Sequence, residues 1–272
     1  MSQIGCQHES LLAKESVQSF LLTSLIHLYE EDGISFGFDL DNHVSDASSA
    51  EGCYQADFVS PDGTPGIDNA YGSLLPYLEA SESESSDNLL EDGDSDEIMP
   101  ILLRISDIQD ERNDDYVEVQ AMMVSGPFLY GADGELLDGQ TLQGYPEPLV
   151  HTQEGRIEDG VLLATNFPFT NSIFSSFVID IEDDRYFLRH RKGHAGGLRT
   201  NFVGGALSDG IISSSIPVEM LHIAYDDTSS VELLNDHINR AADMFPDEYG
   251  NCQEISSVFE FQSIPVHLFG DE

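Results

Sequence analysis

Two neighbouring stretches of the sequence combine carboxylates with turn-forming residues. Residues 39–42 read Asp-Leu-Asp-Asn, and the stretch 57–69 contains a Pro-Asp-Gly turn and a Gly-Ile-Asp-Asn turn. A turning backbone can bring several oxygen atoms to one point, and Ca²⁺ takes about six to eight oxygen ligands. The sequence therefore predicts a structural calcium site with the candidate ligands Asp39, Asp41, Asp57, Asp62, Asp68 and Asn69.

An alternative for the same residues needs no ion. Asp and Asn side chains often accept hydrogen bonds from backbone N–H groups of their own turns. The carboxylates would then stabilise separate turns and would not converge. The sequence leaves both interpretations open.

Positive side chains are concentrated in one island. The chain has 10 Lys and Arg residues, and half of them lie within residues 185–199, beside two histidines. Because Arg binds carboxylates with two parallel hydrogen bonds, the island could hold an anionic ligand or an acidic glycan. The candidate contacts are Arg189, Arg191, His194 and Arg199. The alternative is that these cations neutralise nearby carboxylates.

The chain has three cysteines, Cys6, Cys53 and Cys252, and none of them forms a Cys-x-x-Cys motif. Zinc-ribbon and thioredoxin-type interpretations are therefore excluded. A disulfide between Cys53 and Cys252 would close a long loop and stabilise the fold. The alternative is a pair of separate buried thiols.

Composition limits the function classes. The chain of 272 residues has 51 acidic residues and a formal net charge of -41. Nucleic acids and anionic membranes are attracted by clustered Lys and Arg, so neither is expected as a partner. No apolar run reaches the roughly 20 residues of a membrane span. The charge suits cations, cationic partners or a salty environment.

Enzyme signatures give little support for catalysis. Neither a His-Glu-x-x-His motif nor a phosphate-binding Gly-x-x-x-x-Gly-Lys loop occurs. A pair of carboxylates could hydrolyse glycosidic bonds, but no pair can be singled out among so many acidic residues. We therefore expect a protein without catalytic activity.

These side chains must be positioned by a mainly β fold. Val117, Val119 and Ala121 alternate with polar residues, as in a half-buried strand, and Asp-Gly turn signals recur along the chain. The pattern favours an antiparallel β-sandwich or jelly-roll-like body. Further strands are expected within 101–105, 161–165, 211–216, 220–225 and 258–261, and one late helix within 231–245.

The N-terminal part is expected to differ. Apolar residues between His8 and Glu31 recur at roughly helical spacing, which predicts an amphipathic helix. We therefore divide the chain into an N-terminal helical arm, residues 1–32, and a single β-rich domain, residues 33–272. The arm could pack on the body or on a second copy of the chain. Residues 81–97 are so acidic that we expect an exposed, partly disordered loop.

One hairpin can be predicted residue by residue. The segments 177–182 and 185–190 alternate in polarity on either side of Asp183-Asp184. A two-residue turn would place Glu182 opposite Arg185, Ile181 opposite Tyr186 and Ile179 opposite Leu188.

The carboxylate-rich region also carries a resemblance. The Asp-Leu-Asp run at 39–41, Cys53, Asp57, and the turns at 60–63 and 66–69 resemble uncharacterised secreted bacterial proteins and lipoproteins. The segment 252–256 is similar to their C-terminal region. The resemblance implies a shared fold, export, and an extracellular, periplasmic or cell-surface location, and it implies no known activity.

These observations favour an exported, non-catalytic binding or surface protein that is stabilised by calcium and binds a glycan or another surface component. One alternative is a structural protein that assembles through the N-terminal helix. The other is a secreted glycan hydrolase that uses carboxylates.

Overall fold

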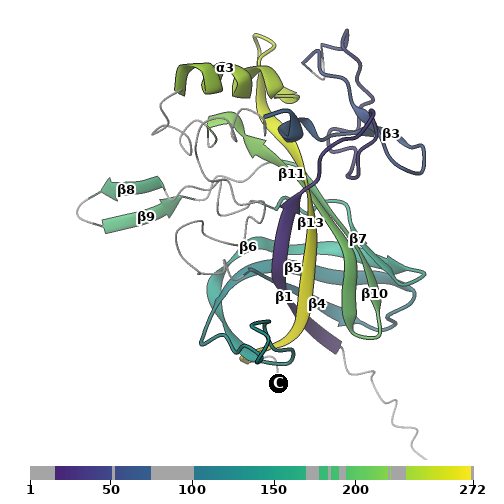
Figure 1. Ribbon diagram of the computed structural model, residues 1–272, viewed down its shortest axis with the longest axis vertical. Helices are drawn as coiled ribbons and strands as arrows, with labels where there is room; N and C mark the ends of the chain where they lie inside the picture. The colour runs from purple at the N-terminus through teal and green to yellow at the C-terminus, as the bar shows by residue number, and fades with distance from the viewer. Residues whose placement is uncertain are drawn as a thin grey trace, which may run out of the picture.

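Eight antiparallel strands of the computed structural model close into a barrel (Figure 1). The structure describes residues 16–50, 53–74, 101–169, 178–182, 185–189, 194–219, 221 and 231–270. The barrel strands, in spatial order, are β1 (Ser16–His27), β4 (Ile101–Ile108), β5 (Asp114–Ser125), β6 (Thr141–Glu158), β7 (Val161–Ala164), β10 (Gly196–Val203), β11 (Ala206–Pro217) and β13 (Cys252–Leu268). Strand β13 pairs with β1, which completes the ring.

The remaining elements are short. They are β2 (Phe58–Val59), β3 (Pro65–Ile67), the 3-10 helix η1 (Ala70–Leu74), β8 (Val178–Glu182), β9 (Arg185–Arg189), α3 (Val231–Ala241) and β12 (Met244–Pro246). The segment that carries β3, together with α3, lies at one end of the barrel (Figure 1). Within the described residues, no helix is long and apolar enough to cross a membrane.

The predicted sandwich is wrong, because the sheet closes on itself. Sandwiches and barrels share the same local pattern of short strands and turns. What distinguishes this barrel is the pairing of its first and last strands, in which His27 lies opposite Phe259 and Phe20 lies opposite Pro265. Partners so far apart in sequence leave no local signal.

The predicted N-terminal helix is also wrong. Residues 16–27 form the barrel strand β1. Phe20 and Leu22 pack in the main core, whereas Leu21 packs in a second cluster with Leu102 and Val266. A strand buried on both faces reads as a continuous apolar run, which periodicity alone cannot distinguish from a buried helix. Residues 1–15 of the expected arm lie outside the described residues.

Other predictions from periodicity are confirmed. The expected strands over 101–105, 161–165, 211–216 and 258–261 fall largely within β4, β7, β11 and β13, and the late helix is α3. The hairpin β8–β9 has the predicted register, with Glu182 opposite Arg185 and Ile179 opposite Leu188. The acidic stretch 81–97 lies outside the described residues, as does most of the strand expected over 220–225.

One glycine of the barrel is required by close packing. A Cβ atom at Gly210 would lie 2.2 Å from the Phe261 ring, to which its strand is paired. Phe261 belongs to the main core with Phe20, Phe202 and Phe259. A side chain at position 210 would therefore displace a core ring.

Candidate functional site

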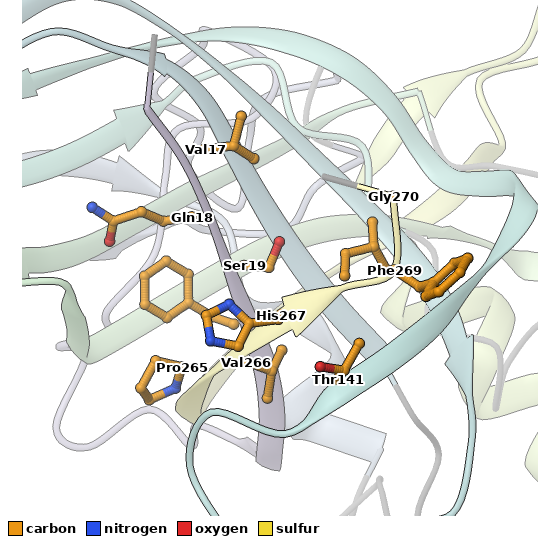
Figure 2. A pocket seen from close by; sticks show the side chains of 11 residues that line it. Val17, Gln18, Ser19, Thr141, Pro265, Val266, His267, Phe269 and Gly270 are labelled. Atoms are coloured by element: carbon orange, nitrogen blue, oxygen red, sulfur yellow. The ribbon is translucent and has the colours of Figure 1, made fainter. Parts of the chain in front are cut away.

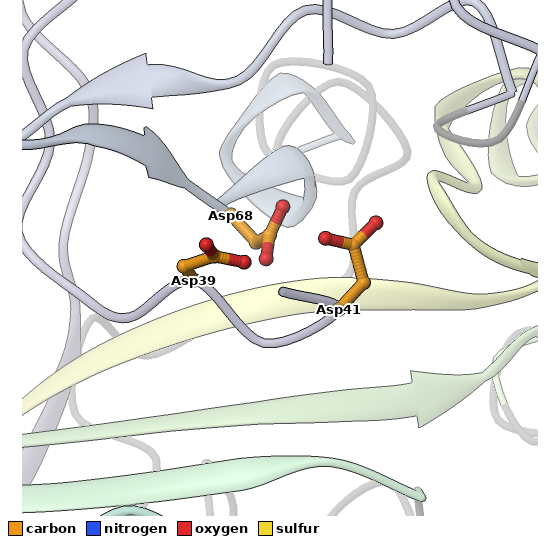
Figure 3. Close-up of side chains that lie close together, drawn as sticks. All are labelled: Asp39, Asp41 and Asp68. Atoms are coloured by element: carbon orange, nitrogen blue, oxygen red, sulfur yellow. The ribbon is translucent and has the colours of Figure 1, made fainter. Parts of the chain in front are cut away.

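The carboxylates of Asp39, Asp41 and Asp68 lie close together (Figure 3). Asp39 and Asp41 come from one loop, and Asp68 directly follows β3. Each residue offers an oxygen atom, and these atoms all lie within 4.8 Å of one another (Figure 3). Asp68 is buried, Asp41 is partly buried and Asp39 is exposed, so the group faces outwards through Asp39. We call Asp39, Asp41 and Asp68 the carboxylate cluster.

Backbone N–H groups fix the geometry of this cluster. The N–H of Leu40 donates to Asp68 Oδ2 at 2.6 Å, which joins the loop to the end of β3. The N–H of His43 donates to Asp39 Oδ1 at 3.0 Å and to Asp41 Oδ1 at 2.8 Å. The loop therefore turns around its own carboxylates, as the sequence pattern suggested.

Gly66 permits the close approach of the two segments. Its backbone φ angle is +90°, a value that residues other than glycine rarely adopt. A Cβ atom at this position would lie 3.2 Å from Asp39 Oδ2. The glycine of the Gly-Ile-Asp-Asn turn therefore leaves room for a carboxylate of the neighbouring loop.

Asp57 is a fourth carboxylate near the cluster. Its Oδ2 accepts a hydrogen bond from the N–H of Ser45. Burial raises the pKa of Asp57, and the negative charges of Asp41 and Asp39 raise it further. Asp57 therefore belongs to the same electrostatic environment as the cluster.

The cluster concentrates negative charge in a partly desolvated place. Burial, followed by the charge of Asp243, raises the pKa of Asp68 to about 9, despite the hydrogen bond from Leu40. Burial also raises the pKa of Asp41. Among the described residues, no lysine or arginine forms an ion pair with the cluster or with Asp57. The charge of His43 lowers the pKa of Asp41 and Asp57, but burial outweighs it at both carboxyl groups.

Asp243 is a neighbour that the sequence did not reveal. It lies between α3 and β12, where its carboxylate accepts hydrogen bonds from the N–H of Ser256 at 2.8 Å and from the Ser256 hydroxyl. Burial raises the pKa of Asp243 to about 7, and the charge of Asp41 contributes. The sequence feature that could have indicated a buried carboxylate is the position of Asp243 between the apolar residues Ala242 and Met244.

The structure places the other two expected ligands elsewhere. Asp62 is exposed and accepts hydrogen bonds from the N–H of Thr64 at 3.1 Å and from the Thr64 hydroxyl at 2.8 Å. Asn69 is buried, and its amide donates to Leu28 O at 2.8 Å and to Ser35 Oγ at 2.9 Å. Asp62 thus stabilises its own turn, and Asn69 ties its turn to the end of β1.

Residues 33–37 read Gly-Ile-Ser-Phe-Gly, which matches the nucleophile-elbow pattern of many hydrolases. That motif requires an exposed serine on a sharp turn between a strand and a helix. Ser35 is instead buried, donates to Phe36 O at 2.9 Å and accepts from the Asn69 amide. No histidine of the described residues bonds to it, so the pattern does not build a nucleophile.

The basic island is only partly described. Arg191 lies outside the described residues, and Arg189 belongs to β9. The exposed Arg199 lies near Asp62 and contributes to the lowered pKa of that carboxyl group, which its own turn lowers most. His194 bonds to Glu254. The two side chains of the island that the structure describes, Arg199 and His194, thus each interact with a carboxylate.

Cys53 and Cys252 lie at disulfide distance, with their Cα atoms 6.0 Å apart. Cys53 precedes the turns that carry Asp57 and Asp68, and Cys252 begins β13. The pair therefore joins the carboxylate-bearing segment to the last barrel strand across 199 residues of sequence.

A separate hollow of about 620 Å³ lies beside β1, where the end of β13 meets the start of β6 (Figure 2). Val17, Ser19, Thr141, His267 and Phe269 are among its lining residues. None of the sequence-predicted site residues lines it, and neither does any carboxylate of the described residues.

The donor set of the carboxylate cluster is the kind that hard cations prefer. All of its donors are carboxylate oxygens, which suit Ca²⁺ or Mg²⁺ rather than metals that prefer sulfur or imidazole ligands. Backbone carbonyls and water commonly complete such a coordination shell.

Comparison of the chain with protein-family models, with curated proteins and with solved structures gives no match.

Proposed function

We propose that this protein is an exported, non-catalytic binding protein whose carboxylate-bearing segment is stabilised by calcium and whose ligand is a glycan. The observation that carries the proposal is the convergence of Asp39, Asp41 and Asp68 with Asp57 nearby. These four residues are among the ligands expected from the sequence.

Electrostatics explains why a cation would stabilise the fold. Partly buried carboxylates that lie close together repel one another and lose hydration, unless a positive charge compensates. A cation that binds only the folded chain adds RT ln(1 + [L]/Kd) to the free energy of unfolding, about 2.7 kcal/mol at a concentration 100 times Kd. Calcium would thus hold the loop at 39–43 against the end of β3.

Export and the absence of catalysis have their own support. Disulfides persist in oxidising compartments, and the Cys53–Cys252 geometry suits such a bond. The resemblance to secreted bacterial proteins points to the same location. The burial of Ser35 within the one nucleophile-elbow match, and a sequence without a His-Glu-x-x-His motif or a phosphate-binding loop, support a binding role.

A melting series tests calcium stabilisation. Thermal unfolding of the full chain is followed while CaCl₂ is raised from micromolar to millimolar, in parallel with NaCl at equal ionic strength. We expect calcium to raise the melting temperature where NaCl does not. If only molar salt stabilises the chain, its acidity reflects adaptation to salt and the calcium proposal fails.

A further inference from the structure

A cavity of about 710 Å³ is lined by both members of the Cys53–Cys252 pair. Each of these cysteines is partly exposed. The volume lies within the range of about 300–1,000 Å³ typical of small-molecule sites, so a small solute can approach the sulfur atoms. Disulfides that solvent reaches are the labile ones, whereas typical structural disulfides resist reduction. We call this space the disulfide cavity.

One histidine of the disulfide cavity is held in a fixed orientation. Glu254, which is 2% exposed, accepts a hydrogen bond from the N–H of His194 at 3.0 Å and bonds to His194 Nδ1. Both residues line the cavity. Residues two apart in a strand point to the same face, so Glu254 holds the imidazole ring on the face of β13 that carries Cys252.

The bond to Glu254 decides what the other ring nitrogen of His194 can do. An ionised carboxylate only accepts hydrogen bonds, so in the neutral ring the proton lies on Nδ1 and Nε2 is an acceptor. No residue that the structure describes forms a hydrogen bond to Nε2, and the side chain is 76% exposed. A thiolate, rather than a thiol, attacks a disulfide. Nε2 is therefore a base that can take the proton of a thiol inside the cavity.

The backbone at Cys53 favours opening of the pair. Cys53 and Tyr54 have φ angles of +51° and +64°, in the left-handed region that is unfavourable for residues with a side chain. Reduction would release Cys53 from Cys252 and let this turn relax. The side-chain amide of Gln55 would still donate to Arg240 O at 2.7 Å, so the turn would be loosened without being detached.

We propose that the Cys53–Cys252 pair is a thiol-exchange site, at which small thiols that enter the disulfide cavity reduce the disulfide while the chain stays folded. His194 Nε2 takes the proton of the entering thiol. The thiolate attacks the sulfur of one cysteine, the S–S bond breaks, and its electron pair goes to the other sulfur, which receives the proton from Nε2. A second thiol attacks the mixed disulfide in the same way, which leaves two protein thiols and one small disulfide.

The exchange acts on the carboxylate-bearing segment. Cys53 precedes the turns that carry Asp57 and Asp68, so reduction frees the start of this segment from the last barrel strand. The exchange itself does not depend on calcium. Its effect on the cation rests on the proposed function, because a loosened segment should bind calcium more weakly than a tethered one.

Reduction of the folded full chain tests the proposal, with reduced glutathione as the probe and without calcium. Free thiols are first blocked with iodoacetamide, and thiols that appear later are trapped with N-ethylmaleimide and counted by mass spectrometry. We expect the rate of reduction to stay constant as urea is raised below the unfolding transition. A rate that rises exponentially with urea would overturn the proposal, because the disulfide would then be reached only by unfolding. So would iodoacetamide labelling of all three cysteines before reduction.

Two variants test the base. His194→Asn can still donate a hydrogen bond to Glu254 but has no basic nitrogen, whereas His194→Ala loses both. At pH 7 only about 3% of a thiol with a pKa of 8.5 is thiolate, so a base can speed the reaction by at most about thirtyfold. We expect both variants to be reduced about tenfold more slowly than the wild type at pH 7, and the difference to disappear near pH 9, where thiolate forms without help.

His151→Ala is the matched control, because His151 is also exposed but lies on β6 in the barrel wall. It should keep the wild-type rate at every pH. If His194→Asn also keeps the wild-type rate and pH profile, His194 has only a structural role and the proposal is overturned. All three variants should melt like the wild type, because the replaced side chains are exposed.

The effect on calcium is read separately. The shift of melting temperature with CaCl₂ is measured for the oxidised and the reduced chain. A smaller shift for the reduced chain supports the effect on the cation, and equal shifts overturn it. Because the rates of exchange are measured without calcium, failure of the exchange site and failure of calcium stabilisation are distinguishable.

Discussion

The N–H of Leu40 donates to Asp68 Oδ2 at 2.6 Å, which joins two loops that lie 28 residues apart in sequence. This hydrogen bond places Asp68 beside Asp39 and Asp41. A buried carboxylate is thereby held where two further carboxylates approach it, an arrangement that protons or a bound cation would stabilise.

Asp68→Asn should abolish most of the stabilisation by calcium while changing the cation-free protein little. Because the pKa of Asp68 is raised to about 9, the carboxyl group is already neutral at pH 7 without a cation, and an amide of similar shape can replace it. Thermal unfolding with and without CaCl₂ measures both effects. Asp62→Asn, in an exposed turn, is the control and should keep the full calcium shift.

Removal of the cysteine pair should destabilise the fold. Cys53→Ser combined with Cys252→Ser should lower the free energy of unfolding by about 2–5 kcal/mol, the usual range for a disulfide of a secreted domain. Urea unfolding measures this loss. A reducing agent should destabilise the wild type by a similar amount and leave the double variant unaffected. If it leaves the wild type unaffected too, the two cysteines are separate thiols.

His27 should make the fold sensitive to mild acid. Burial between Tyr71 and Phe259 lowers the pKa of His27 to about 3, from 6.5 for an exposed histidine. Between these values the unfolded chain binds a proton that the folded chain does not, so stability is lost as the pH falls. One proton corresponds to about 1.4 kcal/mol per pH unit.

The control for this effect is His27→Phe, which keeps an aromatic ring and removes the titrating group. The carboxylates titrate in both proteins, so the difference between their unfolding free energies isolates His27. Between pH 6 and pH 4 the wild type should lose stability relative to the variant. Parallel curves for the two proteins would contradict the prediction.

Gly210→Ala should destabilise the barrel. The new Cβ would lie 2.2 Å from the Phe261 ring, and overpacking of this kind costs about 1–3 kcal/mol. Gly72→Ala is the matched control, because no atom lies within 4 Å of its Cβ position. Adding Phe261→Leu to Gly210→Ala should recover part of the loss in urea unfolding, since a smaller side chain leaves room for the methyl group. A Gly210→Ala variant as stable as the control would contradict this packing.

Local patterns predicted the single elements well and their assembly poorly. The register of the hairpin β8–β9 could be predicted because only two residues separate its two strands. The first strand was mistaken for a helix because Leu21 and Leu22 are buried on opposite faces, which removes the alternation that marks a strand. Closure of the barrel depends on contacts across almost the whole chain, which no local signal records.

The carboxylate cluster was predictable in part for the same reason. Asp39, Asp41 and Asp68 lie in two turn-rich stretches within the first quarter of the chain, and the structure brings them together. Asp62 lies in an equally good turn pattern but bonds within it. Asp243 comes from a distant segment and reaches the same region only through the pairing of β12 with β13.

The pairing of β1 with β13 has a consequence for folding during synthesis. Strand β1 precedes all the other strands described, and β13 follows all of them. During synthesis, β1 therefore leaves the ribosome long before β13, the strand that closes the barrel. Until β13 has been synthesised, one edge of β1 stays unpaired. The nascent chain must therefore remain incompletely folded, or be bound by a chaperone, until the barrel can close.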